Sequence, residues 1–250
     1  YVLSRGDSFS QMALNILHIP VNFGCEIGHL WYIYMLIGLY LVTPIISPWL
    51  QQASKRELEG YLGLWIITTF LPYIHLVYPE VLGEAFWNDT PLLYYFTGFI
   101  GYFILGYYLK RFGYPSAALS WIILIVGFAL SAGIFCSRID TVPTVPELEL
   151  SWGFCTVNVF LMTLGLFSLI GRLSLKGKNA ACKLLSDISI KSYGMYLAHI
   201  LFLNFYYGLF KSISDAAYVT IPLITVCTFI TVYIFVYLLS YLPKSKYIIG

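Results

Sequence analysis

Glu26 and His29 are the first two residues of the chain whose types and spacing could do chemistry. They lie three residues apart, so they share one face if a helix extends back through Glu26. A carboxylate that orients an imidazole is a common acid/base arrangement. A pair of interfacial side chains that reach water at the edge of a membrane explains the same spacing. Both interpretations are open on these residues alone.

Tyr196 and His199 form a second pair, within the apolar segment SYGMYLAHILFLNFYY. A histidine several residues from either end of such a segment usually faces a partner or a wet cavity. A core histidine whose hydrogen bonds are satisfied is an equally good explanation. Tyrosines in the other apolar segments also need hydroxyl partners, and together they suggest a polar cavity. These are Tyr34, Tyr40, Tyr94, Tyr95, Tyr102, Tyr107 and Tyr108.

Lys110 and Arg111 follow the glycine-containing segment FTGFIGYFILGYYL. Two adjacent cations could contact the phosphates of a nucleotide-like cofactor. Membrane topology alone also explains them, because cytoplasmic loops are rich in Lys and Arg. The glycines of the segment favour close helix packing and do not form a phosphate loop, since no strand precedes them and no GK[ST] follows.

Composition narrows the class of protein. Of the 250 residues, 59% are hydrophobic and 10% are charged, against roughly 45–50% and 25% in ordinary globular chains. The five cysteines form no CxxC pair, so we predict no metal site. The formal net charge of +2 is too small to indicate a nucleic-acid partner. The chain is predicted to be an integral membrane protein in contact with lipid.

The apolar segments of spanning length predict an all-α, polytopic transmembrane helix bundle that forms a single membrane-embedded domain over residues 1–250. A spanning helix needs about 20 mostly apolar residues to cross the hydrocarbon core. Seven segments meet this requirement. They are residues 30–49, 61–78, 92–109, 117–136, 152–171, 192–210 and 218–242.

The basic residues predict the orientation of these spans. Eleven of the fourteen Lys and Arg residues fall on one set of alternate loops, which assigns those loops and the C-terminus to the cytoplasm. Residues 1–28 are then an external loop, and their apolar pattern favours an amphipathic helix. The chain begins outside with Tyr1 and has no signal-peptide pattern. Either a signal peptide has been removed or an odd number of preceding spans has been cut away, and the pattern of residues 1–28, typical of a loop helix between two spans, favours the second.

Three stretches together resemble the acyltransferase-3 family of polytopic membrane acyltransferases, close to its bacterial surface-polysaccharide O-acetyltransferases. HLWYIYMLIGLYLVTPIISPW resembles the family's block of histidine, tryptophan, LIGLYL and proline. YYFTGFIGYFILGYYLKR resembles its glycine-rich middle span, and SDISIKSYGMYLAHILFL resembles its late SYGIYLIH span. The resemblance runs from about residue 26 to the end.

The resemblance implies ten spans, of which the first three are missing here, in a multi-pass protein of the plasma (inner) membrane with a cytoplasmic C-terminus. It implies transfer of an acetyl or other acyl group from acyl-CoA, without a metal, to a hydroxyl of an envelope polysaccharide or lipid-linked sugar. The family's catalytic signature, a basic residue shortly before a histidine in the first span, has no counterpart in this sequence. The catalytic residues are therefore unknown, and we expect this chain alone to be inactive.

The same resemblance suggests residues that contact the substrates. Glu26 and His29 are candidates for acceptor binding, and Tyr196 and His199 for lining the cavity. Trp31 and Tyr40 match the first family block by position. Lys110 and Arg111 are the candidates for contacting the acyl-CoA donor.

Two other classes of protein fit the same residues. A transporter or flippase for a lipid-linked or small polar substrate would also use a tyrosine-rich cavity in a helix bundle. Transporters often contain paired repeats with broken helices at matching positions, and no such pairing is visible in this sequence. A membrane scaffold or sensor module is the third possibility. The acceptor, the acyl chain and the oligomeric state cannot be read from the sequence.

Overall fold

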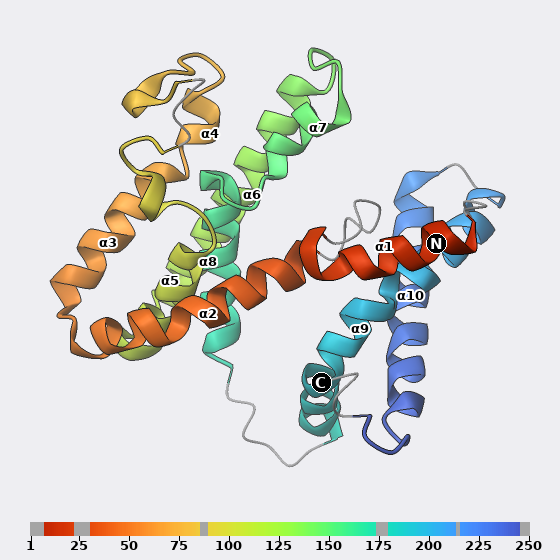
Figure 1. Cartoon of the computed structure of the whole chain (residues 1–250). Helices are drawn as coiled ribbons and strands as arrows, with labels where there is room; N and C mark the ends of the chain where they lie inside the picture. Colours follow the sequence, from red (N-terminus) through yellow and green to blue (C-terminus); the bar gives the residue numbers. More distant parts are fainter. Residues whose placement is uncertain (1–7, 23–30, 86–89, 174–179, 214–215, 246–250) are drawn as a thin grey trace. The chain divides into compact units, whose positions relative to one another are not determined.

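The structure, a computed structural model, describes residues 8–22, 31–85, 90–173, 180–213 and 216–245 (Figure 1). These residues form helices and connecting turns, without a β-strand among them, which confirms the predicted all-α class. They divide into two compact units. The central unit comprises Tyr32–Ser174, and the terminal unit comprises Tyr1–Trp31 with Leu175–Gly250.

The described part of the central unit contains seven α-helices, and the first of them, α2, enters the unit at Tyr32. The α-helices are α2 (Trp31–Gln52), α3 (Lys55–Thr68), α4 (Leu71–Ile74), α5 (Ile100–Phe112), α6 (Ala117–Arg138), α7 (Val145–Leu148) and α8 (Val157–Gly171). Three short 3-10 helices lie between them: η3 (Val81–Gly83), η4 (Tyr94–Phe96) and η5 (Glu149–Trp152).

The terminal unit contains α1 (Phe9–Asn22), α9 (Ala180–Lys211) and α10 (Ala217–Leu239). Helices α9 and α10 pack along each other (Figure 1). Helix α1 occurs within the stretch for which the sequence favours an amphipathic helix, and its Leu17 is exposed. Helix α9 begins well before residue 192, the expected start of its span, so the helix extends beyond its apolar part.

Three described helices, α2, α6 and α10, are long and apolar enough to cross a membrane. A fourth candidate is the pair Val145–Trp152 and Val157–Gly171, which is bent by 42°. Helices α3 and α5 have 14 and 13 residues, fewer than the roughly 20 that a straight span needs. The figure of seven spans thus stays a prediction.

Two expected spans are interrupted in the structure. In the stretch 61–78, α3 ends at Thr68 and α4 begins at Leu71, next to Pro72. The carbonyl oxygen of Thr69 at this break accepts the backbone N–H of Val157 at 3.0 Å. In the stretch 92–109, turns precede α5, and Gly98 has φ +82°, a conformation that glycine adopts readily. Broken helices are tolerated in membranes where protein groups bond the freed backbone.

Trp65 of α3 is the centre of the central unit's core, with no exposed surface. Its ring lies edge-on to Tyr102 and Phe160, with centroid distances of 4.8 and 5.3 Å. Its indole N–H donates to the Gly98 carbonyl at 3.0 Å. A Cβ atom on Gly101 would lie 2.0 Å from the indole ring, so the expected close approach at this glycine accommodates a tryptophan side chain.

Helices α6 and α8 approach each other closely at two glycines, one on each helix. A Cβ atom on Gly127 would lie 2.7 Å from the backbone nitrogen of Met162, and one on Gly165 would lie 2.7 Å from that of Leu124. Small residues permit such backbone contact in membrane helix pairs. The outer side of α6 is apolar and exposed, with Phe128 65% exposed.

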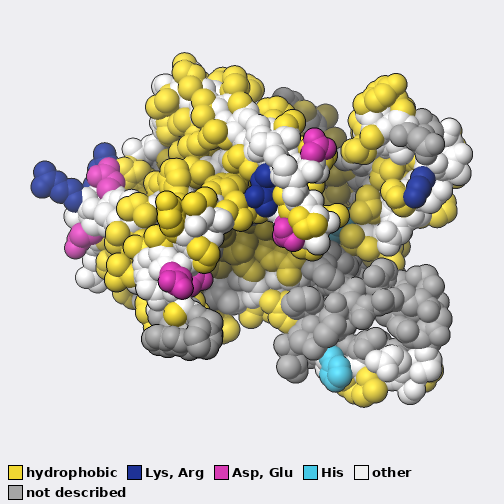
Figure 2. All heavy atoms as spheres, turned by 90° about the horizontal axis from the view of Figure 1, so that it is seen from above, with side chains coloured by type: hydrophobic (Ala, Val, Ile, Leu, Met, Phe, Trp, Pro, Cys, Tyr) yellow, Lys and Arg dark blue, Asp and Glu magenta, His cyan; other side chains and the backbone are white. Residues whose placement is uncertain are grey.

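Figure 2 shows one face of the molecule, on which hydrophobic side chains cover much of the described surface and charged side chains occur in small groups. Large exposed apolar surface is unusual for a chain surrounded by water and is expected for one surrounded by lipid.

Candidate functional site

The α9–α10 cavity is a hollow of about 420 Å³ within the terminal unit. Six of its lining residues come from α9 and four from α10. They are Ile188, Ser192, Met195, Tyr196, His199 and Leu203, with Thr225, Thr228, Phe229 and Val232. The α9 residues recur every three or four positions, so they form one stripe along the helix. Two of the predicted site residues, Tyr196 and His199, therefore line the same cavity.

Tyr196 and His199 lie one helical turn apart. Their ring centroids are 5.6 Å apart, and His199 Nδ1 contacts the backbone carbonyl oxygen of Tyr196. A proton on Nδ1 makes this contact an N–H···O bond and puts the imidazole lone pair on Nε2. In that tautomer the ring accepts a proton or a hydrogen bond through Nε2.

Three hydroxyl groups also line the cavity. Ser192 donates to Ser189 O and Thr225 to Ile221 O, each at 2.8 Å. The Thr228 hydroxyl is buried and has no hydrogen-bond partner among the described residues. The remaining walls are mainly aliphatic and aromatic. Such a cavity suits a mainly apolar group that carries a few polar atoms.

A charged cluster adjoins this cavity. Lys191 and Asp187 of α9 form an ion pair, and the Tyr233 hydroxyl of α10 donates to Asp187 Oδ2 at 2.7 Å. Lys191 is only 8% exposed. The hydrogen bonds from Lys191 and then from Tyr233 hold the pKa of the Asp187 carboxyl below its usual value, so this carboxyl is ionised at neutral pH.

Of the other predicted substrate residues, Trp31 and Tyr40 are among the described residues. Glu26 and His29 lie outside the described residues. Trp31 is the first residue of α2 and is partly buried. Tyr40 lies on α2 in the central unit and is 66% exposed.

Lys110 and Arg111 lie in the last turn of α5 and are both exposed. The Arg111 guanidinium donates to the carbonyl oxygens of Leu50 and Ala53, at 3.0 and 3.1 Å. These carbonyls belong to the end of α2 and the turn before α3, so Arg111 holds this turn against α5. Of the two cations, Lys110 is the one whose side chain has no such structural contact in the described part of the chain.

The turn that Arg111 holds is also stabilised by its own residues. The Ser54 backbone N–H donates to Glu57 Oε2 at 2.7 Å, and the Glu57 backbone N–H donates to Ser54 Oγ at 3.3 Å. This capping box satisfies N–H groups at the start of α3. The side-chain and backbone hydrogen bonds of Ser54 lower the pKa of Glu57.

A second cavity, of about 390 Å³, lies within the central unit. Its lining comes from α2, α5 and α8 and from the segments before α5 and α8, and includes Met35, Phe99, Gly106 and Phe167. The Tyr102 hydroxyl in its wall donates to Phe154 O at 2.7 Å. Of the seven tyrosines that suggested a polar cavity, Tyr102 lines this one. Among the described residues, no three His, Cys, Asp or Glu side chains form a metal-ligand cluster.

The fold defines a multi-pass, helical membrane protein with an open cavity in each of its two units. A family model described as an acyltransferase domain matches residues 4–241. The chain therefore belongs to the acyltransferase-3 family of membrane acyltransferases, as its sequence blocks predict. No curated protein and no solved structure matches the chain.

Proposed function

We propose that the complete protein transfers an acetyl group from acetyl-CoA, or another acyl group from its acyl-CoA, to a hydroxyl of an envelope polysaccharide or lipid-linked sugar. The acceptor oxygen attacks the thioester carbonyl carbon, the carbon–sulfur bond breaks, and CoA leaves as its thiol. A general base takes the hydroxyl proton. The family membership supports acyl transfer, and the donor and acceptor are our proposal.

The observation that carries the proposal at the level of residues is the placing of Tyr196 and His199 in one cavity. The mainly apolar wall favours the acyl end of a substrate, and the imidazole and phenol supply the polar contacts to it. Glu26, His29, Trp31 and Tyr40 are further candidates for binding the acceptor. Lys110 is a candidate for contacting the donor's phosphates. The proposed location is the inner membrane, with the C-terminus in the cytoplasm.

Substitution of His199 tests this proposal. We expect His199→Gln in the complete gene product to lower kcat/KM for acyl transfer by about tenfold, the loss typical of one substrate hydrogen bond. The measurement uses membrane vesicles with the source's own lipids and glycans, and follows radiolabel from acetyl-CoA into the glycan fraction. His18→Gln is the matched control, because His18 is exposed on α1. If the two variants are equally active, His199 does not contact the substrate.

A further inference from the structure

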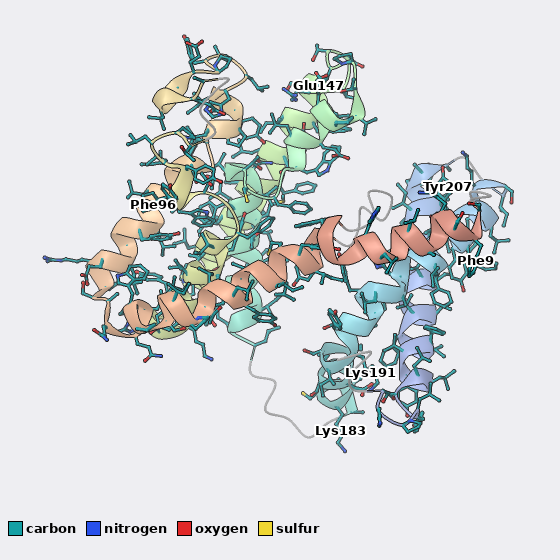
Figure 3. All side chains as sticks on the ribbon, viewed as in Figure 1. Phe9, Phe96, Glu147, Lys183, Lys191 and Tyr207 are labelled. Carbon is teal, nitrogen blue, oxygen red and sulfur yellow. The ribbon has the colours of Figure 1, made fainter. Side chains whose placement is uncertain are left out.

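The charged cluster beside the α9–α10 cavity has no role in binding or chemistry in the proposal above. We call Asp187, Lys191 and Tyr233 the Asp187 clamp. Asp187 and Lys191 lie one turn apart on α9, and Tyr233 reaches Asp187 from α10. Lys191 Nζ also lies 5.2 Å from the centroid of the Tyr237 ring on α10. Figure 3 labels Lys191 where α9 and α10 run side by side. The clamp thus joins two helices.

The clamp is better suited to fixing the position of α9 against α10 than to stabilising the fold. Lys191 is buried, whereas the Asp187 side chain is 31% exposed. Taking the Lys191 charge out of water costs desolvation energy that its attraction to a partly exposed carboxylate often fails to repay. Elsewhere the α9–α10 contact is mainly apolar, with Met195, Ala198, Val232 and Val236 at its centre. One further polar contact crosses it, between the hydroxyl groups of Tyr206 on α9 and Thr231 on α10, at 2.7 Å. Lipid is as apolar as the apolar side chains, so apolar contacts between the helices favour one relative position of α9 and α10 only weakly over another. A polar contact between two helices is a well-attested way of setting their register.

The register of α9 matters because the cavity stripe lies next to the clamp stripe. Asp187 precedes Ile188 and Lys191 precedes Ser192, and the second member of each pair lines the cavity. In the same way, the packed Ala198 precedes the cavity residue His199. Successive residues of a helix are turned by about 100°. A rotation of α9 by one residue would therefore carry His199 away from the cavity wall.

We propose that the Asp187 clamp sets the register of α9 against α10 and thereby positions Tyr196 and His199 at the cavity. Asp187, Lys191 and Tyr233 are positioning residues, which act through His199. The consequence for activity rests on the proposed acyl transfer, whereas the register itself does not.

The register is measured by the distance between spin labels at the two ends of the helix pair. Lys183→Cys on α9 and Tyr218→Cys on α10 supply exposed attachment points, in the complete gene product with its native cysteines replaced by serine. Tyr233→Phe removes the α10 hydroxyl that donates to Asp187 of α9. We expect it to broaden the distance distribution, because a shift of α9 by one residue turns the helix by about 100° and moves it by about 1.5 Å along its axis.

Tyr237→Phe is the matched control. It removes a hydroxyl that accepts only from Tyr241 in the described structure, and it keeps an aromatic ring beside Lys191. We expect its distance distribution to equal that of the parent. Unchanged distances in Tyr233→Phe, or equal broadening in both variants, would overturn the proposal. If Tyr233→Phe does not insert into the membrane, Asp187→Asn, which removes the ion pair, is measured with the same expectation.

The effect on activity is measured by a double-mutant cycle with His199. Tyr233→Phe is expected to lower kcat/KM about tenfold in the parent and to add no further loss in His199→Gln, because both changes remove the same contact. A purely structural role would multiply the two losses, and that result would overturn the positioning role. If no variant or parent transfers label, acyl transfer as proposed is wrong, while the spin-label distances still decide whether the clamp sets the register.

Discussion

The side chain of Asn158 connects several elements of the central unit. It lies on α8 with no exposed surface. Its Oδ1 accepts the Tyr73 hydroxyl at 2.7 Å, and its Nδ2 donates to Ser131 Oγ at 2.7 Å and to Ser151 O at 2.9 Å. An amide without such partners is costly at membrane depth, so these bonds allow a buried asparagine and tie α4, α6 and η5 to α8.

Substitutions of the two cations of α5, Lys110 and Arg111, should change different properties of the protein. We expect Arg111→Met to lower the free energy of unfolding by about 1 kcal/mol, because its hydrogen bonds to Leu50 and Ala53 are lost. Lys110→Met should leave stability unchanged and weaken acyl-CoA binding, since it removes a charge available to the phosphates. Unfolding in detergent and titration of acyl-CoA provide the two measurements.

Each variant serves as the control for the other. If Arg111→Met weakens acyl-CoA binding as strongly as Lys110→Met and leaves the protein equally stable, then Arg111 binds the donor and its contacts with the α2–α3 turn are dispensable.

The sequence could predict contacts at the site that are local in the chain. Tyr196 and His199 stand three residues apart on one apolar segment, and helical spacing alone brings them to one face. The partners of Arg111 are a different case, because they depend on how α2 turns into α3 and packs on α5. Asn158 was not singled out from the sequence, and its partners Tyr73 and Ser131 depend on how α4 and α6 pack on α8.

At the level of helices, close packing of α6 on α8 depends on Gly165. We expect Gly165→Ala to destabilise the protein by about 1–3 kcal/mol, because its Cβ would lie 2.7 Å from backbone atoms of Ser120 and Leu124, which have no rotamer to change. Thermal unfolding in detergent or lipid nanodiscs measures the effect.

Gly133→Ala is the matched control, because Gly133 lies on α6 and a Cβ there would meet no atom within 4 Å. It should leave stability unchanged or raise it by up to about 1 kcal/mol through helix propensity. Equal destabilisation by the two substitutions would show that α6 and α8 do not pack at Gly165 as the structure has them.

The length of the apolar segments correctly predicted a helix in each of the seven stretches. It did not predict where two of these stretches are interrupted. Pro72 marks one break, but the partner that makes the break tolerable is Val157, far along the chain. Gly98 adopts its positive φ beside the Trp65 indole, whose N–H it accepts. Hydropathy averages over such positions, so it cannot separate a straight span from a helix interrupted by long-range hydrogen bonds.

For the molecule as a whole, composition and family describe the same kind of protein. The apolar surface and long helices belong to a multi-pass membrane protein, and the family match covers both units of the chain. Composition alone left enzyme, transporter and scaffold open, because a polar cavity among helices serves each of them. The ordered sequence blocks, with the family match, select an acyltransferase.

The most direct test of the proposed function is acetyl transfer by the complete gene product in sealed membrane vesicles. Radiolabelled acetyl-CoA is supplied at the cytoplasmic face, and label is counted in the polysaccharide and lipid-linked sugar fractions. We predict label in these fractions that depends on the protein and that mild alkali releases as acetate, as an O-ester requires. Fractions that remain unlabelled would contradict acetyl transfer. If the protein in the same vesicles moves a lipid-linked sugar between leaflets, that result would favour a flippase.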